Sequence, residues 1–146
     1  MKNLLIYFFI AMLLGCTPKE DVGGSSFVYF NQTGAQVTVN VYNITLPSIN
    51  GTWNEAYEIA AGEKFHIDYV FKGFSCTDKP FGGTADSVKI IFGNQKEKVY
   101  RKNNLNSRNP LLIGNYQLSS KSEDYCEYLY TITEEDYNNA APIEEK

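Results

Sequence analysis

The chain has 146 residues, and its 17 acidic and 13 basic side chains give it a net charge of −4. This length suits one ordinary domain, and the acidic balance argues against a nucleic-acid-binding protein, which needs a basic surface. Aromatic residues make up 14% of the sequence and charged residues 21%, a composition that excludes global disorder. With one His and three Cys, we predict neither a metal site nor a cofactor.

The N-terminus has the pattern of an export signal. Lys2 is followed by an uninterrupted apolar run over residues 4–14. A helix of that length would span about 16 Å, roughly half of the hydrocarbon core of a bilayer. The run is therefore too short for a membrane-spanning helix, and it is typical of a secretory signal peptide, which we predict over residues 1–15.

The signal ends in the sequence Leu13-Leu14-Gly15-Cys16. This motif resembles the lipobox of bacterial lipoproteins. The resemblance implies that the Cys16 thiol receives diacylglycerol, that a peptidase cleaves before Cys16, and that the new amine is acylated with a palmitate-type chain. The membrane is then a partner through the lipid anchor, without a spanning segment. The alternative is an ordinary signal peptide that happens to contain a cysteine.

Charged residues follow the cysteine directly. Lys19-Glu20-Asp21 resembles the export signal of surface lipoproteins in Bacteroidota-type bacteria, which implies an outer-membrane location on the cell surface. The alternative is a charged, solvated tether. The Gly and Ser residues of Val22-Gly23-Gly24-Ser25-Ser26 are typical of a flexible linker and would continue that tether. We therefore predict a lipidated Cys and a flexible tether over residues 16–26.

The rest of the chain has the periodicity of β-strands. Short runs in which apolar and polar residues alternate are rich in β-branched and aromatic side chains and are bounded by Gly, Asn or Ser. They predict about seven strands, at residues 27–31, 36–43, 56–60, 64–71, 87–92, 96–101 and 126–133. A further, weaker strand is predicted at 111–117. We predict an all-β domain over residues 27–140, an immunoglobulin-like β-sandwich, with a small barrel as the alternative.

The C-terminal end has a helix signal. Thr133-Glu134-Glu135-Asp136 resembles a capping box with Asp in the third place, and it predicts a short helix up to about Ala140. We expect residues 141–146 to form a polar tail.

Parts of this pattern resemble a known group of proteins. Residues 27–31 followed by 37–43, and the ending over 130–137, are similar to small surface lipoproteins of gut Bacteroidota. The resemblance covers most of the mature chain, but it implies no particular activity. Within it, only the lipobox transfers residue by residue.

Two cysteines are left for the mature domain. In an oxidising compartment Cys76 and Cys126 are expected to form a disulfide, which would close a loop of 51 residues. A loop of that size gives about 4 kcal/mol of stabilisation by chain entropy. The alternative is a pair of buried free thiols.

Trp53 is the first candidate for ligand binding. It lies in the turn-like sequence Asn50-Gly51-Thr52-Trp53-Asn54, where an exposed ring could stack on a sugar while neighbouring Asn side chains form hydrogen bonds. Other aromatic residues, Tyr125 among them, could enlarge this surface. The alternative is that Trp53 covers the end of the core.

We predict no catalytic residues and no enzyme. His66 and Asp68 share one strand face, but they are most simply a solvated pair, because no nucleophile or further ligand accompanies them. The chain has no phosphate-binding loop, zinc-ligand spacing or nucleophile motif. A small hydrolase with two acidic residues in a cleft is the third interpretation. Asp86-Ser87-Val88 resembles the O-glycosylation sequon of Bacteroidota, with Ser87 as the acceptor.

The sequence thus predicts a lipid-anchored protein with a binding or assembly role at the outer membrane. Its expected partner is a glycan, an outer-membrane protein or a host surface. The alternative is a glycan-binding accessory lipoprotein that uses loop aromatics such as Trp53.

Overall fold

The computed structural model describes residues 22–45, 52–73, 76–105 and 108–144. The predicted signal peptide, Cys16 and the charged segment at 19–21 lie outside these residues. The described part contains nine strands, the short helix α2 (Glu134–Asn138) and two single 3₁₀ turns, η1 (Pro80–Gly83) and η2 (Ile113–Asn115). The strands are β1 (Val22–Asn31), β2 (Val37–Thr45), β3 (Thr52–Ile59), β4 (Lys64–Lys72), β5 (Ser87–Phe92), β6 (Lys96–Arg101), β7 (Gln117–Lys121), β8 (Tyr125–Ile132) and β9 (Ala141–Pro142).

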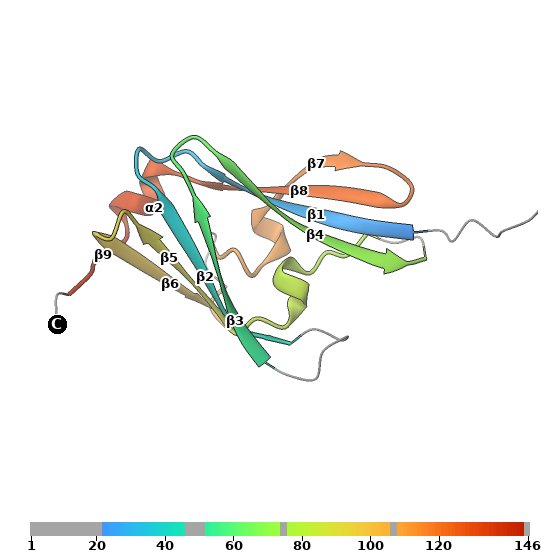
Figure 1. Cartoon of the computed structure of the whole chain (residues 1–146), viewed down its shortest axis with the longest axis horizontal. Coiled ribbons are helices and arrows are strands. Elements are labelled where there is room, and N and C mark those ends of the chain that lie inside the picture. The colour runs from blue at the N-terminus through green and yellow to red at the C-terminus, as the bar shows by residue number, and fades with distance from the viewer. Residues whose placement is uncertain (1–21, 46–51, 74–75, 106–107, 145–146) are drawn as a thin grey trace, which may run out of the picture.

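The strands form two sheets, which Figure 1 shows as two layers. Sheet A has the order β4-β1-β8-β7, and sheet B has the order β3-β2-β5-β6-β9. All pairs are antiparallel except β1 with β8, which run parallel. The prediction of an all-β fold with two sheets around one core is confirmed.

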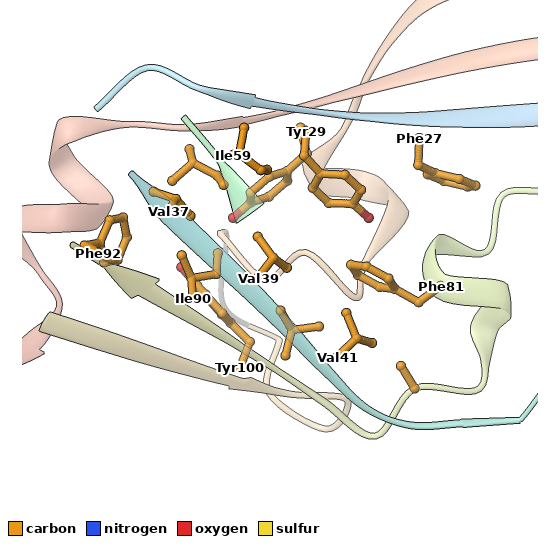
Figure 2. Packing of buried hydrophobic residues seen from close by; sticks show 14 of the residues in the cluster. Phe27, Tyr29, Val37, Val39, Val41, Ile59, Phe81, Ile90, Phe92 and Tyr100 are labelled. Carbon is orange, nitrogen blue, oxygen red and sulfur yellow. The ribbon is translucent and has the colours of Figure 1, made fainter. Parts of the chain in front are cut away.

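The core lies between the two sheets and is built from alternate strand residues (Figure 2). Phe27 and Tyr29 of β1 face Val37, Val39 and Val41 of β2, and all five side chains are almost completely buried. Burying a hydroxyl without a partner is costly, and among the described residues only the Tyr100 hydroxyl is a buried side-chain group without one. The Tyr29 hydroxyl, by contrast, lies 2.8 Å from that of Tyr116.

Strand β1 begins earlier than the sequence indicated. Residues 22–26, which we expected in the tether, form the first half of this strand. Gly24 lies so close to β4 that a Cβ there would meet the Tyr69 carbonyl oxygen at 2.4 Å. The Oγ of Ser25 donates to the Thr77 carbonyl at 2.9 Å and accepts from the Thr77 N–H at 2.8 Å. The small residues therefore serve close packing here, and the predicted tether is shortened.

Two further strands differ from the prediction. Where a weak strand was expected at 111–117, the chain forms the turn η2 and then β7, which pairs with β8. Part of the expected polar tail is ordered as β9, because Ala141 and Pro142 pair with Glu97 and Lys96 at the edge of sheet B.

The predicted capping box is present at α2. The side chain of Asp136 accepts hydrogen bonds from the N–H of Thr133 at 3.0 Å and from its hydroxyl at 3.1 Å. Arg108 donates to both carboxylate oxygens of Asp136, and Lys98 Nζ lies 3.7 Å from one of them. This buried carboxylate fixes the C-terminal helix against sheet B and the segment that contains Arg108.

Candidate functional site

The outer face of sheet A carries a trough along β1. Phe27 and Tyr29 of this strand face the core, so the alternate residues Gly24, Ser26 and Val28 face outward. These three have small side chains or none, whereas the strands on both sides present larger ones. We call the following nine residues the β1 trough: Gly24, Ser26 and Val28 as the floor, Val70, Asp68 and His66 from β4, and Tyr125, Glu127 and Leu129 from β8.

The trough is hollowed where β1 begins, whereas Ser26 and Val28 farther along the strand are 0% and 2% exposed and are covered by the flanking side chains. Val70 and Tyr125 both lie opposite Gly24, and their side chains are 72% and 40% exposed. Each neighbouring strand is about 4.8 Å away, so the two walls stand roughly 10 Å apart. The resulting groove has a volume of about 340 Å³ and is lined by Gly23, Gly24, Asp68, Tyr69, Val70, Asp124 and Tyr125.

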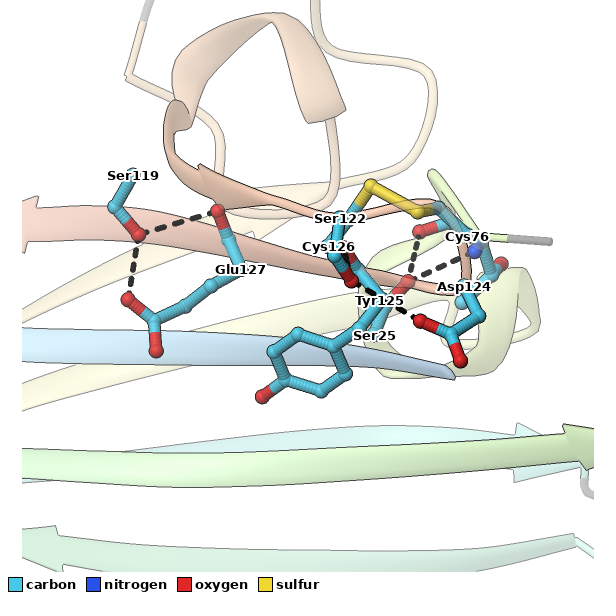
Figure 3. The surroundings of a disulfide bond; sticks show 9 residues. Ser25, Cys76, Ser119, Ser122, Asp124, Tyr125, Cys126 and Glu127 are labelled. Carbon is cyan, nitrogen blue, oxygen red and sulfur yellow. Dashed lines mark hydrogen bonds between the residues drawn. A yellow bond between two sulfur atoms is a disulfide. The ribbon is translucent and has the colours of Figure 1, made fainter. Parts of the chain in front are cut away.

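Carboxylates give this groove its polar character. Among the described residues, Asp68 and Asp124 line it, and no Lys or Arg does. Ser122 Oγ donates to Asp124 Oδ1 at 3.1 Å, and Ser119 Oγ donates to Glu127 Oε1 at 2.6 Å (Figure 3). These hydroxyls orient Asp124, which lines the groove, and Glu127, which lies farther along the trough. Both carboxylates can still accept hydrogen bonds from a ligand, since each carboxylate can accept several.

A disulfide braces the strand that carries Tyr125. Cys76 and Cys126 are joined, with a Cα–Cα distance of 5.4 Å, which is the pairing expected from the sequence. Cys126 points to the opposite face of β8 from Tyr125 and Glu127 (Figure 3). The bond ties the segment after β4 to the start of β8, so both walls of the groove are held from the side of the core.

The structure separates the other candidate residues from this trough. Trp53 lies in β3 of sheet B with its backbone opposite Ile44, and its side chain lies outside the described part of the chain. Ser87 is the first residue of β5, partly exposed, and lies opposite Tyr42. Cys16 lies outside the described residues.

His66 and Asp68 are brought into the trough. Both are exposed on the outer face of sheet A, and His66 Nδ1 lies 3.5 Å from Ser26 Oγ. Among the described residues, no group of three or more His, Cys, Asp or Glu side chains is arranged to hold a metal ion.

A second, smaller groove of about 260 Å³ lies beside α2 and is lined by Thr33, Gly34, Ala35, Glu134 and Tyr137. Of the described residues that line it, Glu134 supplies the carboxylate, which already accepts a hydrogen bond from the Gly34 N–H at 2.7 Å. The β1 trough is therefore the stronger candidate, because it combines an exposed ring with several carboxylates.

The largest electrostatic effects among the described residues act on buried or partly buried groups. Burial raises the pKa of Asp136, but the hydrogen bonds from Arg108 and from the Thr133 N–H outweigh it, so the net pKa lies below its ordinary value. Burial, with a smaller contribution from Glu55, raises the pKa of Tyr69 to about 12. Asp136 lies far from the trough and fixes the C-terminal helix, whereas Tyr69 lines the groove at the start of β1.

The sequence did not point to the trough as a site, although it marked some of its residues. Asp68 and His66 were placed on one strand face, and Tyr125 was named among the aromatic residues. The floor was missed because Gly23, Gly24, Ser25 and Ser26 have the composition of a linker. Gly23-Gly24 and Ser25-Ser26 place the same residue types on both faces, so no alternation marks this segment as a strand.

Comparisons with known proteins add no relative: no protein-family model, curated protein or solved structure matches the chain. Among the described residues, no helix has the length and hydrophobicity needed to cross a membrane.

Proposed function

We propose that this chain is a lipoprotein of the outer membrane, held at the cell surface by diacylglycerol and palmitate on Cys16, with a non-enzymatic binding or assembly role. The observation that carries the proposal is the sequence Leu13-Leu14-Gly15-Cys16 at the end of a short apolar run. The charged residues at 19–21 favour export to the surface, as in Bacteroidota-type lipoproteins. Expected partners are a glycan, an outer-membrane protein or a host surface.

The position of β1 supports an anchored domain. This strand begins at Val22, six residues after Cys16, so only residues 17–21 lie between the cysteine and the folded domain. Six residues span about 20 Å when fully extended. The domain would therefore stay close to the membrane surface.

We also propose that the sandwich belongs to the immunoglobulin-like class. Two mostly antiparallel sheets with a shared core support this assignment. The internal position of β1, between β4 and β8, would be a variation on that class.

A role in binding rather than catalysis is supported by the trough itself. Its His66 and Asp68 are exposed to solvent, whereas general acid–base catalysis favours groups that are shielded from water. The third interpretation, a small hydrolase, would need the acidic residues of the trough to act on a bound substrate.

Saccharide binding is the second candidate function, and the trough favours it. The half-exposed ring of Tyr125 could stack on a sugar face, and the carboxylates of Asp68 and Asp124 could accept hydrogen bonds from its hydroxyls. In this proposal Tyr125 takes the leading role that the sequence suggested for Trp53.

Cell fractionation tests the anchor. We expect the wild-type protein in the outer-membrane fraction, where protease added to whole cells degrades it, and the variant Cys16→Ser outside that fraction. Thr17→Ser, one residue away, is the matched control and should behave as wild type. Equal distribution of the Cys16→Ser and wild-type proteins would contradict lipid anchoring.

A glycan array tests the second candidate. On saccharides that bind the mature domain, we expect Tyr125→Ala to weaken binding about tenfold, the usual size of one aromatic contact. The control Tyr42→Ala removes a partly exposed ring on sheet B and should bind as wild type. If only Trp53→Ala weakens binding, the site lies at Trp53. Release of a shortened saccharide would contradict the non-enzymatic role.

A further inference from the structure

We infer that the β1 trough binds a neutral saccharide. This saccharide is the headgroup of a lipid in the same membrane that holds the Cys16 anchor. This inference rests on the proposed anchor at Cys16. It goes further by naming the ligand class and its source.

The lining of the groove selects for an uncharged, hydroxyl-rich ligand. The carboxylates of Asp68 and Asp124 line it, and the described lining residues include no lysine or arginine, so these carboxylates would repel an anionic ligand. Carboxylates accept hydrogen bonds from hydroxyl groups, which a neutral sugar supplies. Tyr125 adds a ring on which the C–H face of a sugar can pack.

The groove lies between two walls at the start of β1. Gly24 adds no side chain between Val70 and Tyr125, which lie opposite it on β4 and β8. The Tyr69 carbonyl occupies the position of a Gly24 Cβ, so the room for a sugar ring is the groove volume between the two walls.

The anchor places the deep end of the trough near the lipid. Gly24 is eight residues after Cys16, so the connecting chain reaches at most about 28 Å. β1 begins, β4 ends and β7 turns into β8 at the same end of sheet A (Figure 1). This end would therefore lie within reach of membrane headgroups.

Exposed apolar side chains at this end fit the same surroundings. Phe71, opposite Gly23, is 40% exposed, and its neighbour Val70 is 72% exposed. Because Val70 and Phe71 are consecutive residues of β4, their side chains lie on opposite faces of sheet A. Aromatic and apolar side chains of this kind are favoured in the interfacial layer of a bilayer, next to lipid headgroups.

Vesicle binding tests the inference with the mature chain from Thr17 onward, without lipid, because the described fold begins only at Val22. The probes are phosphatidylcholine vesicles with or without neutral glycolipids that carry glucosyl, galactosyl or digalactosyl headgroups. We expect co-sedimentation with at least one glycolipid and none with phosphatidylcholine alone. Tyr125→Ala should weaken it about tenfold, and Val70→Ser should weaken it as well.

Matched controls and alternative outcomes are available. Val99→Ser removes a side chain that is 46% exposed on β6 of sheet B and should bind as wild type. Equal binding to vesicles without glycolipid would overturn the inference, as would equally tight binding to the soluble saccharide, or no binding to any probe. None of these results bears on lipid attachment at Cys16, which cell fractionation tests separately.

Discussion

Gly24 is the residue on which the shape of the trough depends most directly. Its missing side chain lets β1 approach the Tyr69 carbonyl of β4, where a Cβ would meet the oxygen at 2.4 Å. We predict that Gly24→Ala lowers the free energy of unfolding by about 2 kcal/mol, because the two strands must separate. Urea denaturation measures the change.

The control for this substitution is Gly114→Ala, where an added Cβ would meet nothing within 4 Å. It should leave stability unchanged or raise it slightly, since Ala has less backbone freedom than Gly in the unfolded chain. Equal effects of the two substitutions would show that the close approach at Gly24 does not matter for stability.

Asp136 is the residue whose ionisation matters most for the fold. Its pKa is lowered in the folded state from an ordinary value of 3.8. The carboxylate therefore contributes its full stabilisation above the unfolded pKa, and the contribution is lost as the pH falls through the folded pKa. We predict that Asp136→Asn lowers the unfolding free energy at pH 7 by about 2 to 3 kcal/mol.

The pH profile gives the sharper test. Wild-type stability should fall below about pH 5, and the Asp136→Asn profile should be flatter there. Glu135→Gln, exposed on the same helix, is the control and should follow the wild-type profile. Parallel profiles for wild type and Asp136→Asn would contradict the assigned role.

At the scale of elements, the disulfide joins the segment after β4 to the start of β8. We predict that the double variant Cys76→Ser with Cys126→Ser loses about 4 kcal/mol of unfolding free energy, because the unfolded chain gains the freedom of a 51-residue loop. Thermal unfolding of the reduced wild-type protein should match the double variant. Unchanged stability in both would contradict a structural role for the bond.

The elements that sequence patterns predicted correctly are those with strong local signals. The alternation of Val37, Val39 and Val41 marks β2, and the capping box from Thr133 to Asp136 marks α2. These signals lie within one element, so the sequence contains them without knowledge of the partners.

The elements that were missed depend on partners far away in the chain. Gly23–Ser26 have a linker composition, and only the contacts with Tyr69 and Thr77 make them part of a strand. Ala141–Pro142 becomes β9 only through pairing with β6. The trough requires the parallel register of β1 with β8, which places Tyr125 opposite Gly24 and which no local pattern encodes.

At the scale of the whole molecule, the proposed anchor at Cys16 would be attached to the end of sheet A at which the trough is hollowed. β1 starts six residues after Cys16, and the deep part of the trough lies at its third residue. A lipid anchor would therefore hold the site close to the membrane, and it would leave sheet B and α2 farther from it. This arrangement connects the export signal with the chemistry of the groove.

The most direct measurement is the mass of the N-terminal peptide of the protein extracted from membranes. We predict a peptide that begins at Cys16 and carries the added mass of diacylglycerol and an amide-linked acyl chain. The same preparation from Cys16→Ser cells should lack this species. An N-terminal peptide that contains unmodified Cys16, or that begins elsewhere, would contradict lipid anchoring and with it the proposed place of the trough beside the membrane.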